Sequence, residues 1–194
     1  MNNLERLGAS FRDPSGFLFK RDGVLYRQVN TSYRKAYDHL MSSGLYDALT
    51  ASHKMVAHTE TNEPPAEPDR AYKVIQPELI PMISYPYEWS FSEMKDAALL
   101  TLEVGRMALQ KNMILKDASA YNIQFLDGKP ILIDTLSFDI YHEGQLWDGY
   151  RQFCQHFLAP LGLASLVDIR LMQLMRVYID GIPLDLASEL LPGK

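Results

Sequence analysis

The pattern of apolar and polar positions divides the chain into a strand-rich first part and a helix-rich second part. Runs of β-branched and aromatic residues bounded by turn residues predict strands over residues 17–19, 24–29, 55–59, 72–75 and 79–85. Helical spacing of apolar residues predicts helices over residues 31–43, 44–53, 91–111, 147–158, 167–179 and 184–191, with a short helical turn within 1–12. The longest of these helices begins with Ser90-x-x-Glu93, a capping-box pattern. Pro160-Leu161-Gly162 is expected to separate the helix over 147–158 from the helix over 167–179.

The segment 116–138 holds the densest arrangement of polar residues. Alternating apolar residues lead to Asp127-Gly128, a strong hairpin turn signal, and the return strand is almost wholly apolar and ends at Asp134. A carboxylate directly after a buried strand is costly to bury alone, so Asp134 is expected to meet a cation or a hydrogen-bond donor. The hairpin folds Asn122 back towards Asp134, with Asp117 just upstream. This arrangement predicts a magnesium and phosphate site.

These residues also carry a resemblance to a known family. Asp117-x-x-x-x-Asn122, a hairpin and an apolar strand ending in Asp134 resemble the catalytic loop and metal-binding segment of the protein-kinase-like fold, as in protein kinases and aminoglycoside phosphotransferases. The resemblance implies that Asp117 is the catalytic base, and that Asn122 and Asp134 hold the Mg²⁺ that bridges the ATP phosphates. The motif departs from the family at Leu115-Lys116 and at Thr135-Leu136. The alternative is an ordinary hairpin whose Asp and Asn residues cap turns and a helix end.

The resemblance implies an α+β, protein-kinase-like two-lobed fold in one compact unit. Residues 1–85 form the small antiparallel β-rich lobe, and residues 86–194 form a mainly helical lobe that carries the hairpin and is shortened relative to the family. The long helix over 91–111 leads directly into the Asp117 loop, as in that fold. Asp148 is a candidate to bond the backbone amides of this loop, and a helix-cap role is its alternative.

Three further residues are candidates for binding the nucleotide. Arg27 lies in register with the strand lysine that holds the phosphates in this family, and a solvated strand cation is its alternative reading. Lys73 on a later strand is a fallback cation. Glu88 belongs to the segment that corresponds to the hinge between lobes, where backbone groups take the adenine edge. The helix over 31–43 contains no Glu to pair with the strand cation.

Composition narrows the class of protein. With 194 residues and 47% hydrophobic content, the chain can bury a core as one domain or one two-lobed unit. A net charge of −5 argues against a broad nucleic-acid surface, which needs a concentrated basic face. The single Cys154 excludes an internal disulfide and suits a reducing compartment. Without an apolar signal region or a run long enough to span a membrane, the chain is expected to be cytoplasmic and without a membrane partner.

A second resemblance covers nearly the whole chain. The stretches SFRDPSGFLFKRDGVLYRQVN, YDHLMSSGLY and DASAYNIQF with PILIDTLSFD are similar to the N-terminal region of bacterial proteins catalogued as class I SAM-dependent methyltransferases. This similarity implies a methyltransferase domain as a partner, in cis or in trans, and a chain that is part of a longer protein. SAM itself is not expected here, because the chain shows no strand followed by a glycine-rich G-x-G-x-G loop.

Two hypotheses follow. In the first, the chain is a degenerate kinase-like module that binds a nucleotide with Mg²⁺, or a small-molecule substrate, for an attached methyltransferase. In the alternative, it is an active Mg-ATP-dependent phosphotransferase that acts on a small-molecule hydroxyl. The missing helix Glu and the absence of a glycine-rich phosphate loop near Gly16 favour the first hypothesis.

Overall fold

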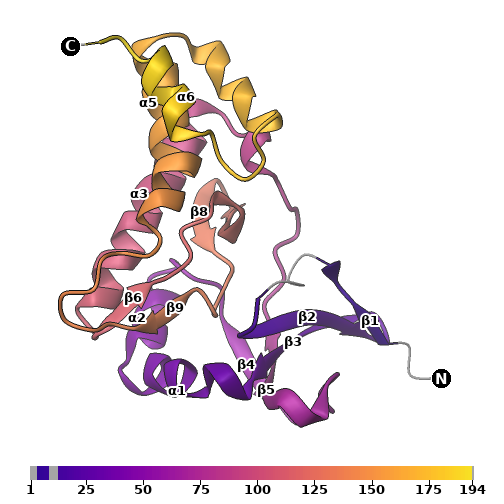
Figure 1. Ribbon diagram of the computed structural model, residues 1–194. Coiled ribbons are helices and arrows are strands. Elements are labelled where there is room, and N and C mark those ends of the chain that lie inside the picture. The colour runs from indigo at the N-terminus through magenta and orange to yellow at the C-terminus, as the bar shows by residue number, and fades with distance from the viewer. Residues whose placement is uncertain (1–3, 9–12, 194) are drawn as a thin grey trace.

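The computed structural model describes residues 4–8 and 13–193, and its first part is an antiparallel sheet (Figure 1). The five strands lie in the order β1-β2-β3-β5-β4, with all neighbours antiparallel. They are β1 (Leu4–Arg6), β2 (Gly16–Arg21), β3 (Val24–Asn30), β4 (His58–Thr61) and β5 (Ala71–Pro77). The chain is therefore a mixed α+β protein.

The β2–β3 hairpin confirms the prediction made from the Asp-Gly turn. Asp22 and Gly23 have φ angles of 49° and 84°, and Arg21 pairs with Val24 across the turn. Both turn residues are left-handed, which is the conformation that a two-residue hairpin turn needs and that Asp-Gly sequences favour.

One strand prediction is wrong, and one strand was not predicted. Residues 4–6 pair with β2 as a strand, in a range (1–12) where only a short helical turn was expected and which also includes residues outside the described ones. Residues 79–85 form no strand. Prolines at positions 77, 81 and 86 remove backbone donors in and beside this stretch. Leu79 and Met82 stay exposed, so burial does not offset that loss.

Two helices connect β3 to β4, as predicted. A short 3₁₀ turn, η2 (Thr31–Tyr33), leads into α1 (Arg34–Ser42), and α2 (Leu45–Ala51) follows after one residue pair. Gly44 separates them with a φ of 76°, a conformation that costs glycine little. In Figure 1 these helices lie beside the sheet, at the end of β4 and β5 nearest to the second part of the chain.

The second part is mainly helical and contains two small strand pairs. Its longest helix, α3 (Phe91–Leu109), begins at Ser90 with the predicted capping box. The strand pairs are β6 (Met113–Leu115) with β9 (Phe138–Ile140), and β7 (Ile123–Leu126) with β8 (Lys129–Leu132). The remaining elements are the helices η3 (Pro68–Arg70), η4 (Pro86–Glu88), η5 (Ala120–Asn122), α4 (Tyr150–Phe153), η6 (Cys154–Leu158), α5 (Ala159–Leu166), η7 (Ile169–Arg176) and α6 (Leu184–Leu190).

Helical structure continues through Pro160, where the sequence predicted a break. The segment from α4 through η6 to α5 is uninterrupted, and η6 is a π-helical turn directly before the proline. A π-turn widens the helix, so the missing proline N–H and the bulk of its ring are accommodated at the start of α5.

Residues of α1, α2 and the helical part pack together in one large core. Leu40, Leu45 and Leu49 belong to the same buried cluster as Met94 of α3 and Phe157 of η6. The sheet contributes to two smaller clusters. The division of the chain into residues 1–85 and 86–194 stays a prediction. Of the helices in the described ranges 4–8 and 13–193, none combines the length and apolar character needed to cross a membrane.

Candidate functional site

The segments that carry Asp117, Asn122 and Asp134 meet at Ser137. Asn122 Nδ2 donates to Ser137 Oγ at 3.2 Å, and that hydroxyl donates to Asp134 Oδ2 at 2.7 Å. The backbone N–H of Asp117 reaches the Ser137 carbonyl at 3.4 Å, and Ser137 is fully buried. The structure therefore links Asn122 and Asp134 through one hydroxyl and holds the Asp117 loop against the same residue.

Asp134 lies just after β8 and meets both a cation and hydrogen-bond donors, as its position after a buried strand predicted. Its Oδ1 accepts from the Leu136 N–H at 3.0 Å and lies 2.5 Å from Nη1 of Arg27. Its Oδ2 accepts from Ser137. Arg27 comes from β3, and its Nη2 lies 3.4 Å from Oδ2 of Asp13. A single guanidinium thus connects two carboxylates from distant parts of the chain.

The side chains at Asp134, as they are arranged, do not fit a magnesium ion. Mg²⁺ requires several oxygen ligands in near-octahedral geometry. Both carboxylate oxygens of Asp134 already accept hydrogen bonds, and the Arg27 guanidinium adds a positive charge that repels a dication. Within the part of the chain that the structure describes, no group of three or more His, Cys, Asp or Glu side chains is arranged to hold a metal. The geometry therefore does not support Asn122 and Asp134 as metal ligands while Arg27 is in place.

Asp117 lies in a loop that is held by its own turns and by one helix. Its Oδ1 accepts from the Ser119 N–H at 3.0 Å, and the Ala118 N–H donates to Oε1 of Gln152 at 2.7 Å. Asp148, the sequence candidate for bonding this loop, instead accepts from Nε2 of Gln145. Gln152 lies four residues after Asp148, so the bond to the loop comes from about one helical turn further along the chain. The sequence pointed to the Asp148 carboxylate for this contact and did not reveal the Gln152 amide.

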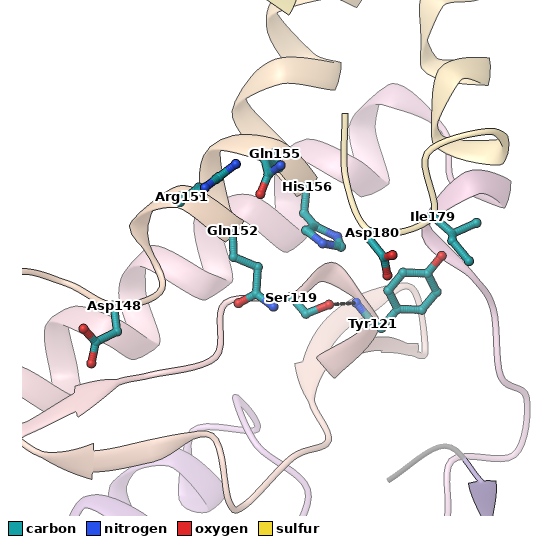
Figure 2. A pocket seen from close by; sticks show the side chains of 9 residues that line it. All are labelled: Ser119, Tyr121, Asp148, Arg151, Gln152, Gln155, His156, Ile179 and Asp180. Carbon is teal, nitrogen blue, oxygen red and sulfur yellow. Dashed lines mark hydrogen bonds between the residues drawn. The ribbon is translucent and has the colours of Figure 1, made fainter. Parts of the chain in front are cut away.

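A polar cavity of about 420 Å³ adjoins the Asp117 loop (Figure 2). Its wall includes Ser119 and Tyr121 of the loop, Arg151, Gln152 and His156 of the α4–η6 segment, and Asp180. Burial lowers the pKa of His156, while the charges of Asp117 and Asp180 act in the opposite direction. Asp117 itself is not part of this wall, but its carboxylate accepts from the N–H of Ser119, which is.

Lys73 and Glu88 bond elsewhere and do not join this cluster. Lys73 Nζ lies 2.5 Å from Glu60 Oε2 on the neighbouring strand β4, and hydrogen bonding to that carboxylate raises the pKa of Lys73. Glu88 accepts from the Tyr85 N–H at 2.8 Å and thereby caps η4. Both side chains therefore have partners within the sheet or at a helix end. Their predicted roles in nucleotide binding stay predictions.

No acid of α1 reaches Arg27 in the described structure. Asp38, the nearest substitute for the missing Glu, accepts from the hydroxyl of Tyr72 at 2.6 Å, and His39 bonds to the carbonyl of Lys111. The partners of Arg27 are Asp13 and Asp134 instead. The charge of Arg27 is therefore balanced by two acids that lie outside α1.

Two more polar contacts attach the sheet to the loop region. Tyr33 donates its hydroxyl to the Phe138 carbonyl at 2.7 Å, within the buried interior. Lys116 Nζ donates to Ser15 Oγ at 2.8 Å and lies 4.6 Å from the centre of the Tyr33 ring. Sequence reasoning missed these contacts because each joins residues about a hundred positions apart. We call this region, where Arg27, Tyr33 and Lys116 meet the segment 134–138, the junction.

The fold and the junction define a mixed α+β protein in which a small antiparallel sheet attaches to a helical part through polar contacts. No protein-family model matches the chain. Among curated proteins, the nodulation protein NoeA of Rhizobium meliloti (strain 1021) is 36% identical to it over 185 residues. The match covers 92% of this chain but only 37% of NoeA, so the chain spans little more than a third of this relative.

Proposed function

We propose that the chain is a degenerate kinase-like module that binds a nucleotide at the junction and does not transfer its phosphoryl group efficiently. The observation that carries the proposal is the meeting of Asn122 and Asp134 at the Ser137 hydroxyl, with the Asp117 backbone N–H at the Ser137 carbonyl and Arg27 of β3 at Asp134. The order of elements supports it: a small antiparallel sheet, the long helix α3, the Asp117 loop, the β7–β8 hairpin and Asp134 follow one another as the kinase-like resemblance implies.

Two features support the degenerate reading. An active small lobe pairs its strand cation with a helix Glu, and α1 offers none, so Arg27 is compensated by Asp13 and Asp134. A phosphate that approaches Arg27 must compete with these two carboxylates. Such competition lowers the affinity for the phosphate and leaves its position less fixed, and phosphoryl transfer depends on positioning.

The alternative of an active phosphotransferase has one observation in its favour. Among the described residues the Asp117 carboxylate forms no ion pair, and it bonds the N–H of Ser119, which lines the polar cavity of about 420 Å³. A carboxylate in this setting is able to accept a proton from a bound hydroxyl. The cavity is large enough for a small acceptor molecule, and this is the place where we expect a small-molecule substrate to bind.

Nucleotide-dependent thermal shift combined with a turnover assay tests the proposal. We expect ATP at about a hundredfold excess over its Kd to raise the Tm by about 5 °C or more. ADP release across a panel of hydroxyl acceptors is expected to stay at background. Asp117→Asn serves as a control, because it changes the predicted base and leaves Arg27 and Asp134 intact. Steady ADP release that Asp117→Asn abolishes establishes the alternative, and a Tm unchanged by any nucleotide contradicts the module itself.

We also propose that the module acts with a methyltransferase domain. The residues matched in NoeA are 37% of that protein, which leaves room in the relative for a further domain. Binding of this chain to the remainder of NoeA, produced as a separate protein, tests the partnership. A complex on size-exclusion chromatography with methyl transfer from SAM by the remainder is the expected result. A remainder without SAM-dependent activity contradicts this part of the proposal.

A further inference from the structure

We infer that the guanidinium of Arg27 takes the place of a divalent cation at the junction, so that the native site works without a metal ion. Removal of this guanidinium is expected to open a site for Mn²⁺ or Mg²⁺ between Asp13 and Asp134. The inference concerns the bare protein and does not require that a nucleotide binds.

The geometry around Arg27 is that of a cation held between two anionic groups. Nη1 lies 2.5 Å from Asp134 Oδ1, and Nη2 lies 3.4 Å from Asp13 Oδ2. The side chains of Arg27 and Asp134 are 9% and 14% exposed, so this contact is largely shielded from water. Shielding strengthens the attraction between the charges and raises the cost of leaving either carboxylate without a cation.

Arginine suits this position better than lysine. Its planar fork presents separate N–H groups to two carboxylates at once, whereas an ammonium is a single point charge. Arg27 contacts the two acids through its two terminal nitrogens. Its Nε is buried and has no hydrogen-bond partner in the described part of the chain. The two acids therefore determine where the guanidinium lies.

The groups around Asp134 provide oxygen ligands once the guanidinium is gone. Asp13 and Asp134 each turn a carboxylate oxygen towards the position of Arg27. Asn122 and Ser137 are bonded to each other, and Ser137 is bonded to Asp134. Carboxylate and hydroxyl oxygens are ligands that hard divalent cations accept. With Arg27 removed, the two acids lie beside a partly shielded space without a cation, and a dication compensates them.

A phosphorylated ligand that reaches the native junction therefore meets a guanidinium and no metal. We expect it to bind through direct charge-assisted hydrogen bonds from Arg27, which is the way guanidinium groups hold phosphate. This mode predicts that binding of such a ligand is the same in EDTA and in Mg²⁺.

Mn²⁺ binding, followed by electron paramagnetic resonance of free Mn²⁺ and by Tm, tests the inference directly. Wild type is expected to bind no Mn²⁺, while Arg27→Ala binds about one ion and gains about 5 °C or more in Tm at a hundredfold excess over Kd. Arg27→Lys keeps a cation and is expected to bind none. Asp134→Asn added to Arg27→Ala removes a ligand and is expected to abolish binding.

Two outcomes of the Mn²⁺ measurements overturn the inference. One is a wild-type protein that binds Mn²⁺ at a site that Asp134→Asn removes, and the other is a folded Arg27→Ala protein that binds none. Should Arg27→Ala fail to fold, Arg27→Gln replaces it, because glutamine retains most of the packing volume without the charge. If neither variant folds, the wild-type measurement decides, since its binding of Mn²⁺ at Asp134 contradicts the inference and a lack of binding supports it.

Thermal shift with ATP separates this inference from the proposed function. An equal rise of Tm in EDTA and in Mg²⁺ supports both. A rise that occurs only with Mg²⁺ overturns the inference and leaves the nucleotide-binding module standing. No rise under either condition removes the proposed function, while the Mn²⁺ measurements still decide on the role of Arg27.

Discussion

The helical part and the sheet are stabilised in different ways. Residues of α3, the α4–η6–α5 segment and the small strand pairs share one continuous core, which also includes α1 and α2. The sheet has only small clusters, such as Phe17 with Phe19 and Val74, and cations lie against their aromatic rings. It joins the helical part through the polar contacts of the junction and through a small apolar cluster in which Val29 and Ile75 pack with Leu136. One large apolar core thus dominates the stability of the first region, while small apolar clusters and polar contacts together hold the second.

This contrast explains where the candidate site lies. Polar groups carry chemistry only where burial and charge hold them in defined positions. The junction provides that setting at Arg27 and Asp134, whose side chains are largely buried and held by an ion pair and by hydrogen bonds. Substitutions in the two regions should therefore separate loss of folding from loss of the site.

Phe157→Ala is expected to have the largest effect on stability. Phe157 is fully buried in the main core, and truncation of such a ring lowers the free energy of unfolding by about 3 to 5 kcal/mol. Phe19→Ala is the matched change in the small cluster of the sheet, where collapse is easier, so its cost should lie near the lower end of that range. Chemical denaturation of both variants measures the difference. A larger loss for Phe19→Ala contradicts the contrast between the regions.

The pH dependence of stability provides the second test, at His58 between the sheet and the helices α1 and α2. Burial lowers the pKa of His58 to about 4 from an ordinary value of about 6.5, with Glu60 opposing and Arg27 assisting the shift. Its ring contacts the Tyr37 hydroxyl at 3.0 Å, and the Tyr46 hydroxyl bonds to its backbone.

The unfolded chain therefore binds the His58 proton more readily than the folded one. The stabilising contribution is present above pH 6.5 and is lost as the pH falls towards 4, amounting to about 3 kcal/mol. Urea denaturation at pH 7.0, 5.5 and 4.5 measures it, and His58→Gln is the control that should flatten this part of the profile. Equal slopes for wild type and His58→Gln are incompatible with this prediction.

The sequence predicted the parts of the fold whose cause is local. Asp22-Gly23 and Asp127-Gly128 both form the turns that their residues favour, and Ser90 with Glu93 begins α3. The strands β6 and β9 were missed because each has three residues and their pairing closes a long loop without a turn signal. Pro160 misled the helix prediction, since the π-turn before it leaves no clear mark in the sequence.

The sequence singled out some residues of the junction but not the contacts between them. Arg27 and Asp134 were both identified, the first for phosphate and the second for metal. Sequence reasoning did not pair them, although opposite charges at one site attract each other before any ligand arrives. Ser137 and Gln152 were missed because a lone hydroxyl or amide carries no spacing that distinguishes it from surface residues.

Tyr33→Phe tests the attachment of the sheet with a smaller expected effect. The lost hydroxyl leaves the buried Phe138 carbonyl without its donor, which should lower the free energy of unfolding by about 1 to 2 kcal/mol. Burial, together with the charges of Asp134 and Asp139, raises the pKa of Tyr33, so the hydroxyl stays a donor at ordinary pH. Tyr26→Phe is the control, because Tyr26 is half-buried, its ring stacks on Phe19, and its hydroxyl has no hydrogen-bond partner among the described residues. Equal costs for the two variants contradict a role for the Tyr33 hydrogen bond.

Lys73→Ala should have the smallest effect, because its ion pair lies at the solvent-exposed side of the sheet. The side chains of Lys73 and Glu60 are 36% and 42% exposed, and pairs of this kind contribute about 0 to 1 kcal/mol. Water and salt screen the attraction between them, whereas the pair between Arg27 and Asp134 is shielded. A Tm within about 2 °C of wild type, together with unchanged nucleotide binding, is therefore expected. We assign phosphate binding to Arg27 rather than to Lys73. If nucleotide binding is lost in Lys73→Ala and kept in Arg27→Lys, this assignment is reversed, because Lys73 of β5 is then the cation that holds phosphate.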